Sequence, residues 1–187
     1  MKTGKLIVLT GPSGVGKGTL LRALRRRHPE LYLSVSVTTR SPRAGEINGR
    51  HYYFIDRHQF EQMVAAGELL EWAEFAGNYY GTLRRQVETH LQEGEWVVLE
   101  IELEGARQIR RSFPEALQIF LLPPTMDALE TRIRERGKDS EESMALRLQR
   151  AKEEIAAAGE FDFQIVNDNL EKALEEIEAA VFAPVSC

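Results

Sequence analysis

Short apolar runs alternate along the chain with longer segments in which apolar residues recur every three or four positions. A short continuous apolar run is typical of a buried strand, and the longer periodic segments are typical of amphipathic helices. Gly and Pro residues mark most of the boundaries between them. The predicted strands are 6–9, 31–37, 52–55, 69–75, 79–81, 96–101, 117–122 and 163–166, and the predicted helices are 17–27, 56–67, 83–93, 105–112, 126–135, 140–158 and 170–182.

The order of these elements predicts an α/β fold, because strands that alternate with helices form a parallel sheet covered by helices. The strand-rich segment from about 37 to 82 interrupts the alternation and predicts a small mixed insertion, in which Gly77-Asn78 marks a tight turn. The two helices between 126 and 158 are joined by Gly137-Lys138-Asp139. They are rich in charge and poor in apolar anchors, so we expect them to form a mobile flap.

Composition limits the class of protein. The chain has 187 residues, of which 43% are hydrophobic and 28% charged, a balance that predicts one compact domain. The formal net charge of -5 argues against a broad basic surface for nucleic acid. One cysteine, Cys187, excludes an intramolecular disulfide, and the four histidines lack the close ligand spacing of a zinc site.

No apolar run approaches the roughly 20 residues of a membrane span. The first apolar stretch, 6–10, is too short for the core of a signal peptide and leads directly into a glycine-rich turn. We therefore expect a cytoplasmic protein that binds neither membrane nor nucleic acid. The sequence indicates no particular oligomeric state.

The glycine-rich turn between the first strand and the first helix carries a P-loop motif. Gly11, Gly14 and Gly16 allow backbone N–H groups to turn toward phosphate oxygens, and the helix that follows directs its positive end at the same anion. Lys17 adds a charge near the β- and γ-phosphates. The residues predicted to bind a nucleoside triphosphate are Gly11, Pro12, Ser13, Gly14, Val15, Gly16, Lys17, Gly18 and Thr19.

The end of this motif departs from the strict pattern, which has Ser or Thr directly after the lysine. Here Gly18 occupies that place and the hydroxyl comes at Thr19. The direct ligand of a magnesium ion is therefore left open: Thr19 can instead hold a phosphate oxygen, with Mg2+ bound mostly through water. The motif by itself is shared by GTPases, ATPases and small-molecule kinases.

A second site is predicted in the insertion. Arg40 and Arg43 are three positions apart, and Pro42 between them restrains the backbone. Two guanidinium groups at the end of a strand suit the binding of a phosphate. Tyr52 and Tyr80 offer hydroxyl donors to the same group.

Glu71 lies in a mostly apolar stretch, where a buried carboxylate requires hydrogen-bond donors. Guanine supplies two, its N1–H and its 2-amino group, whereas adenine has neither on that edge. The hydroxyl groups of Ser36 and Thr82 can donate to guanine O6. The insertion therefore favours a guanine nucleotide.

With these residues in place, the chain resembles the guanylate kinase family over nearly its whole length. The stretch 38–49, in combination with the P-loop, is the most specific part of the resemblance. The matching stretches are 11–17, 36–49, 71–73, 77–82, 100–106 and 165–168.

The resemblance implies a three-part enzyme, an α/β fold with a P-loop three-layer core and parallel sheet, an inserted mixed β-rich GMP-binding subdomain and a helical lid. It also implies ATP-dependent phosphorylation of GMP, and of dGMP, to GDP with release of ADP, by in-line transfer with Mg2+ and no covalent intermediate. The implied parts are the core 1–35, 83–124 and 159–187, the GMP-binding subdomain 36–82 and the lid 125–158.

Site residues also follow from the resemblance. Glu102 stands where the family usually has an aspartate near guanine, and Glu100 corresponds to an acidic position near metal and phosphates. The GMP-binding residues implied are Ser36, Arg40, Arg43, Tyr52, Glu71, Tyr80, Thr82 and Glu102. The P-loop residues are joined at ATP by Arg132, Arg136 and Asn167, and the catalytic residues implied are Lys17, Arg40, Arg43, Arg136 and Arg147.

Alternatives remain at this point. Guanylate-kinase-like domains of scaffold proteins bind protein partners without catalysis, although they typically lack the P-loop lysine that is present here as Lys17. A kinase for another phosphorylated small molecule is a second alternative. The lid arginines can also belong to a solvated face of salt bridges.

Overall fold

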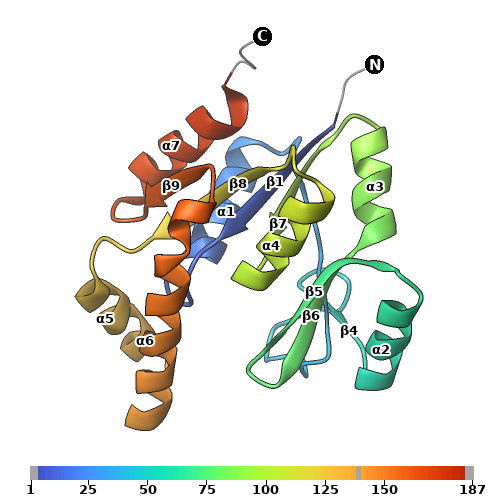
Figure 1. Cartoon of the computed structure of the whole chain (residues 1–187). Helices are drawn as coiled ribbons and strands as arrows, with labels where there is room; N and C mark the ends of the chain where they lie inside the picture. The colour runs from blue at the N-terminus through green and yellow to red at the C-terminus, as the bar shows by residue number, and fades with distance from the viewer. Residues whose placement is uncertain (1–3, 138–139, 184–187) are drawn as a thin grey trace. The chain divides into compact units, whose positions relative to one another are not determined.

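The computed structural model describes residues 4–137 and 140–183, except for the side chain of Arg136. Lys138 and Asp139 of the predicted turn, and Cys187, therefore lie outside the described residues. The chain forms two compact units (Figure 1). Unit 1 comprises Met1–Leu6 and Glu30–Ala116, and unit 2 comprises Ile7–Pro29 and Leu117–Cys187.

Unit 2 is built on parallel strands. Strand β8 pairs in parallel with β1 on one side and with β9 on the other. The apolar residues 6–9 of β1 and 119–121 of β8 are buried, which explains why these strands are nearly continuous apolar runs in the sequence. The elements are β1 (Lys5–Thr10), α1 (Lys17–Arg27), β8 (Leu117–Leu122), α5 (Met126–Arg136), α6 (Glu141–Ala156), the 3-10 helix η1 (Ala158–Glu160), β9 (Phe163–Val166) and α7 (Leu170–Phe182).

Unit 1 contains a parallel pair, β2 with β7, and a mixed four-stranded sheet in the order β4-β3-β6-β5. In the mixed sheet β3 runs parallel to β4, whereas β6 is antiparallel to β3 and β5. Helix α2 covers this sheet through Phe60, which packs with Val37 and Leu69. The elements are β2 (Tyr32–Leu33), β3 (Val37–Thr38), β4 (Tyr53–Phe54), α2 (Arg57–Ala65), β5 (Leu69–Phe75), β6 (Asn78–Leu83), α3 (Arg84–Gln92), β7 (Trp96–Glu100) and α4 (Leu103–Ser112).

The predicted α/β class is confirmed, with parallel pairing and an additional mixed sheet. The predicted start of α2 is also confirmed. Asp56 accepts a hydrogen bond from the Gln59 backbone N–H at 2.8 Å, and the Gln59 side chain accepts one from the Asp56 N–H at 3.1 Å. This capping box satisfies two N–H groups at the end of the helix.

The single strand predicted over 31–37 is wrong. Two short strands, β2 and β3, occupy its ends and belong to different sheets. The backbone N–H of Ser34 still bonds to the carbonyl of Val98 on β7 at 3.0 Å, but the chain then leaves that strand for the mixed sheet. Alternation along a sequence does not reveal such a change of sheet.

The β5–β6 turn lies one residue earlier than predicted. Ala76 and Gly77 both have positive φ, 50° and 78°, and Asn78 already belongs to β6. Two consecutive positive φ values match the twist of a tight hairpin, and alanine at such a position gives no signal in the sequence.

The expectation that α5 and α6 have little apolar anchoring is wrong. Leu129 and Ile133 on α5 and Met144 and Ala151 on α6 form a buried cluster. These residues are spaced by four positions on α5 and by seven on α6, so each helix carries one narrow apolar stripe among many charges. No described helix is both long and apolar enough to cross a lipid bilayer.

Ile133→Ala tests this cluster. The Ile133 side chain is 1% exposed, and removing buried methyl groups should lower the free energy of unfolding by about 2–5 kcal/mol. The matched control is Leu146→Ala on α6, whose side chain is 68% exposed and which should change stability by about 0.5 kcal/mol or less. Chemical denaturation measures both, and equal effects would show that the cluster does not stabilise the helices.

Candidate functional site

The phosphate loop of unit 2 has the backbone that an anion site requires. Gly14 and Gly16 have φ values of 86° and 98°, which glycine adopts without strain. Gly16 is the N-cap of α1, and the first helical bond runs from the Leu20 N–H to its carbonyl at 3.1 Å. The first N–H groups of an α-helix point along its axis at the positive end of the helix, so the start of α1 suits the binding of phosphate oxygens.

Lys17 lies along the same loop. Its Nζ donates to the carbonyl oxygen of Gly11 at 2.6 Å, and the side chain is half-buried. Gly11 in turn approaches β8 so closely that a Cβ atom there would lie 2.8 Å from the Leu121 carbonyl oxygen. The absence of a side chain at Gly11 therefore sets how closely the loop follows the strand.

Gly18 and Thr19 form the unusual end of the motif. A Cβ atom on Gly18 would meet only Arg22, at 3.5 Å, so packing does not require glycine there. The Thr19 hydroxyl group is exposed and accepts a hydrogen bond from Arg22 at 3.1 Å.

Arg132 and Asn167, which are predicted to bind ATP, both bond to the backbone of the loop. Asn167 Nδ2 donates to the Val15 carbonyl at 2.8 Å. Arg132 donates to the Val15 carbonyl at 3.4 Å and to the Asn167 carbonyl at 3.0 Å. A Cβ atom on Gly16 would lie 2.6 Å from Asn167 Nδ2, so the glycine allows the amide to approach. Two distant segments thus fix one carbonyl of the phosphate loop.

In unit 1, Arg40 is paired with a partner that the sequence analysis missed. Its guanidinium group donates to both carboxylate oxygens of Glu46, at 3.0 and 2.9 Å, and Glu46 also accepts from the Arg43 backbone N–H at 2.7 Å. The Arg40 guanidinium lowers the pKa of Glu46 to about 2. Glu46 therefore holds the guanidinium in place, whereas the side chain of Arg43 is exposed.

Two tyrosines lie beside Arg40. The Tyr52 and Tyr80 ring centroids are 6.0 Å apart, and Arg40 Cζ lies 5.3 Å from the centre of the Tyr52 ring. Burial, followed by the nearby charge of Glu100, raises the pKa of Tyr52 to about 12. Its hydroxyl group thus stays protonated and can donate a hydrogen bond at neutral pH.

A β-bulge turns Glu71 into the protein. Leu69 pairs with Leu83 and Glu71 pairs with Thr82, so β5 advances two residues while β6 advances one. Leu70 is the extra residue, and three consecutive side chains of β5 are buried as a result. The bulge explains why a carboxylate follows two leucines into the interior.

The buried carboxyl of Glu71 is 4% exposed. Thr82 Oγ1 donates to its Oε1 at 2.6 Å. Burial raises the pKa of Glu71 to about 7, with Thr82 opposing the rise and the charge of Glu102 adding to it. Tyr80 and Thr82 are two residues apart on β6, so their side chains lie on the same face of the mixed sheet. Glu71 thus belongs to the same surface as Arg40, Tyr52 and Tyr80, which we call the Arg40–tyrosine group.

The other predicted residues are more loosely placed. Ser36 and Glu102 are half-buried, and Glu100 is exposed at the end of β7. Arg147 is exposed on α6. The side chain of Arg136 lies outside the described residues. The structure therefore brings Arg132 to the phosphate loop and groups the predicted residues of the mixed sheet, whereas Arg147 lies on the exposed surface of α6.

Known proteins match this chain over nearly its whole length. The family model described as guanylate kinase matches residues 3–184. The chain belongs to the guanylate kinase family. A guanylate kinase of Nostoc sp. is 68% identical over 180 residues, 96% of this chain and 90% of its own length. Another, of Thermosynechococcus vestitus, is 62% identical over 181 residues, 97% of this chain and 95% of its own.

A solved guanylate kinase structure has the same fold. The crystal structure of guanylate kinase from Anaplasma phagocytophilum matches with a TM-score of 0.78 at 32% identity, over 97% of this chain and 86% of that one. The family resemblance stated from the motifs is thus confirmed.

Three residues in this member of the guanylate kinase family were missed by sequence reasoning: Glu46, Gly105 and Gln108. Glu46 follows Arg40 by six positions in the same loop, which was a usable signal. Gly105 is a buried glycine in the first turn of α4, and a Cβ atom there would overlap the Glu71 carboxylate. Gln108 bonds to the backbone of Trp72. Neither of the last two has a local signal for these contacts.

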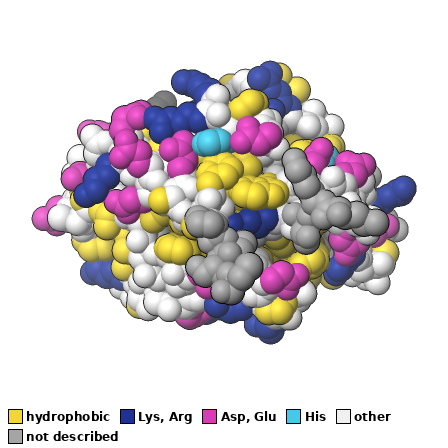
Figure 2. Space-filling view, turned by 90° about the horizontal axis from the view of Figure 1, so that it is seen from above, with side chains coloured by type: hydrophobic (Ala, Val, Ile, Leu, Met, Phe, Trp, Pro, Cys, Tyr) yellow, Lys and Arg dark blue, Asp and Glu magenta, His cyan; other side chains and the backbone are white. Residues whose placement is uncertain are grey.

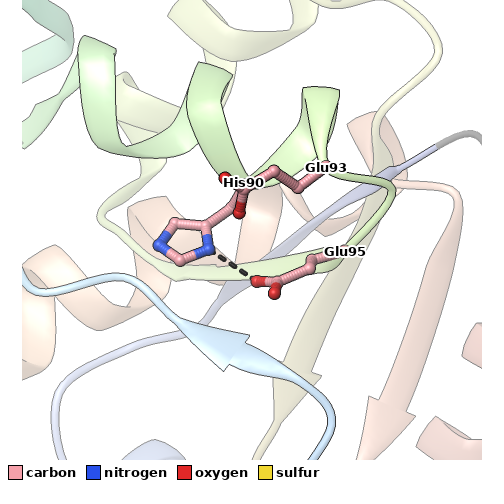
Figure 3. A group of neighbouring side chains, drawn as sticks. All are labelled: His90, Glu93 and Glu95. Atoms are coloured by element: carbon pink, nitrogen blue, oxygen red, sulfur yellow. Dashed lines mark hydrogen bonds and ion pairs between the residues drawn. The ribbon is translucent and has the colours of Figure 1, made fainter.

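A cluster of metal-capable side chains lies at the end of α3 (Figure 3). Ligand atoms of His90, Glu93 and Glu95 all lie within 4.8 Å of one another. His90 Nδ1 is 2.5 Å from a Glu95 oxygen, and its ring stacks on Tyr32 of β2 with centroids 3.5 Å apart. The histidine and Glu95 thus bond each other, and the stack joins the end of α3 to β2.

Asn167→Ala should loosen the phosphate loop. The loss of the amide bond to Val15, worth about 0.5–1.5 kcal/mol, should weaken ATP binding by about 2- to 10-fold. Calorimetric titration with a non-hydrolysable ATP analogue measures the change. Gln149→Ala, at an exposed position of α6 where the side chain donates to Glu153 at 3.1 Å, should leave ATP affinity unchanged. Equal affinities of both variants would contradict the role of Asn167.

The raised pKa of Glu71 predicts a pH dependence of stability. Between about pH 4.5 and 7 the folded chain holds a proton on Glu71 that the unfolded chain has lost. The stability from the neutral carboxyl is thus present below pH 4.5 and lost as the pH rises through about 7. Relative to Glu71→Gln, the free energy of unfolding should fall by about 3 kcal/mol from pH 4 to pH 8. A pH-independent difference in denaturation would contradict this.

Proposed function

We propose that this chain catalyses the ATP-dependent phosphorylation of GMP to GDP, with release of ADP. Membership of the guanylate kinase family supports the reaction, and one structural observation carries the assignment of GMP. A buried carboxyl, Glu71, shares one sheet face with the Arg40–tyrosine group. This arrangement supports the proposal that an acceptor for a base and donors for a phosphate share one surface.

The base is recognised at Glu71. When the carboxyl ionises, its oxygens accept the two donors of the guanine edge, N1–H and the 2-amino group, and Glu102 adds a second acceptor. Ser36 offers a hydroxyl donor to O6, whereas the one hydroxyl hydrogen of Thr82 is donated to Glu71 Oε1. Adenine has no such donor pair, so AMP would leave a buried carboxylate unsatisfied, which costs about 1–3 kcal/mol or more.

The phosphate of GMP is held by the cationic end of the site. Glu46 fixes Arg40, and the tyrosine hydroxyl groups donate beside it. Arg43 follows on an exposed loop and supplies a second guanidinium group. Charge-assisted hydrogen bonds of this kind orient an attacking phosphate oxygen as well as bind it.

ATP is held by unit 2. The N–H groups at the start of α1 and the Lys17 ammonium bind the phosphates, and Arg132 and Asn167 shape the loop. Arg136 and Arg147 of the lid then neutralise charge on the transferred phosphoryl group. Transfer proceeds in line from ATP to the GMP phosphate, without a covalent intermediate.

Mg2+ fits the chemistry of the phosphate loop. Thr19 offers an exposed hydroxyl group there, and Mg2+ prefers oxygen ligands together with water and substrate phosphates. When bound, the ion neutralises phosphate charge during transfer. The division into a core, a GMP-binding subdomain (36–82) and a lid (125–158), and the use of dGMP, are part of the same proposal.

Small molecules suit the surface better than nucleic acid does. On the face shown in Figure 2, acidic and basic side chains are interspersed rather than gathered into a basic field. The net charge of -5 points the same way.

A substrate panel tests the proposal. ADP formation from ATP should be fast with GMP, present with dGMP and at least 100-fold lower in kcat/KM with AMP, UMP or CMP. Glu71→Gln should lower kcat/KM for GMP by about 10- to 100-fold, because one acceptor becomes a donor facing the guanine edge.

The controls separate the possible failures. ATP affinity of Glu71→Gln should equal that of the unmodified chain. Turnover of AMP as fast as that of GMP would contradict the proposal that the site recognises guanine. A lack of ADP formation with every monophosphate would favour a binding module instead.

A further inference from the structure

Helix α4 approaches the Glu71 carboxyl more closely than any ordinary residue would allow. Gly105 is the third residue of this helix and is buried. A Cβ atom built on it would overlap Glu71 Oε2 and lie 3.0 Å from Glu71 Cδ. Because Oε1 is already held by Thr82, the carboxyl cannot simply rotate away without losing that bond.

The same helix also holds the backbone next to Glu71. The Gln108 side chain accepts a hydrogen bond from the Trp72 N–H at 3.1 Å and donates to the Trp72 carbonyl at 2.7 Å. Strand β5 is an edge strand, so these backbone groups have no neighbouring strand on that side. Gln108 completes the edge as a further strand would.

Both contacts come from one face of α4, since residues three apart in a helix are neighbours on its surface. We propose that Gly105 and Gln108 are positioning residues for guanine recognition: Gly105 gives the Glu71 carboxyl the space in which it meets the base, and Gln108 fixes the strand that carries it. This inference rests on the proposed function and adds to its base site two residues that position the Glu71 carboxyl.

The first turn of α4 contributes charge as well as space. The N–H groups at the start of a helix have no intrahelical acceptor and form its positive end. That positive end would favour an ionised Glu71, whereas the charge of Glu102 at the N-cap of α4 opposes ionisation. A side chain at position 105 would push the carboxyl away from the turn and out of register with guanine.

Gly105→Ala tests the space. It should raise the KM for GMP at least 10-fold, with kcat changed less than threefold and ATP affinity unchanged. Gly159→Ala is the matched control, because a Cβ atom there would have no neighbour within 4 Å. It should leave both kinetic constants unchanged.

A double-mutant cycle separates positioning from a general structural effect. In the Glu71→Ala background, Gly105→Ala should change the KM for GMP less than twofold, because the carboxyl it displaces is gone. Effects of Gly105→Ala that are equal in both backgrounds would overturn the proposal.

Gln108→Ala provides an independent variant if Gly105→Ala does not fold. It should raise the KM for GMP about 3- to 10-fold, whereas Gln62→Ala, on the exposed side of α2, should not change it. A KM for Gln108→Ala equal to that of the control would overturn the role of Gln108.

The outcomes also distinguish this inference from the proposed function. Absence of GMP turnover by the unmodified chain would overturn both. Normal turnover with loss of GMP selectivity in Glu71→Ala, together with a Gly105→Ala variant identical to Gly159→Ala, would overturn only the positioning by Gly105.

Discussion

The burial of a carboxyl group at Glu71 is the constraint around which unit 1 is organised. A carboxylate in the interior is unfavourable unless it finds donors or stays protonated. The bulge at Leu70 turns it inward, Thr82 donates to one oxygen, and Gly105 leaves room for the other. The resulting site is complete only when a ligand supplies further donors, and guanine has two on one edge.

The phosphate loop is the electrostatic opposite of the Glu71 site, because it gathers positive charge to bind an anion. Here backbone N–H groups and Lys17 gather positive charge, and the loop has to keep its shape without the anion. Asn167 and Arg132 do this by bonding to the Val15 carbonyl from two distant segments. Arg40 is held in a comparable way by Glu46, so in both places a cationic site is fixed by contacts outside its motif.

Sequence reasoning was most successful where a functional residue also requires a particular backbone conformation. Gly14 and Gly16 have positive φ, a conformation that favours glycine, so the phosphate loop could be predicted from its residue types. Glu71 stood out because a charge in an apolar run requires an explanation. The contacts of Gly105 and Gln108 could not be predicted, since they depend on how α4 meets β5. The anchoring of α5 and α6 was underestimated because Leu129 and Ile133 are few among many charges.

The central claim is that burial raises the pKa of the Glu71 carboxyl to about 7, so that about half of the molecules hold it protonated at neutral pH, and that it ionises when guanine binds. A titration of labelled glutamate side chains by carbon-detected NMR, assigned with Glu71→Gln, tests it directly. Without nucleotide the Glu71 midpoint should lie near pH 7, and saturating guanosine, which has no titrating phosphate, should lower it by at least one pH unit. A midpoint near 4.5 without nucleotide, or one that guanosine leaves unchanged, would contradict the account.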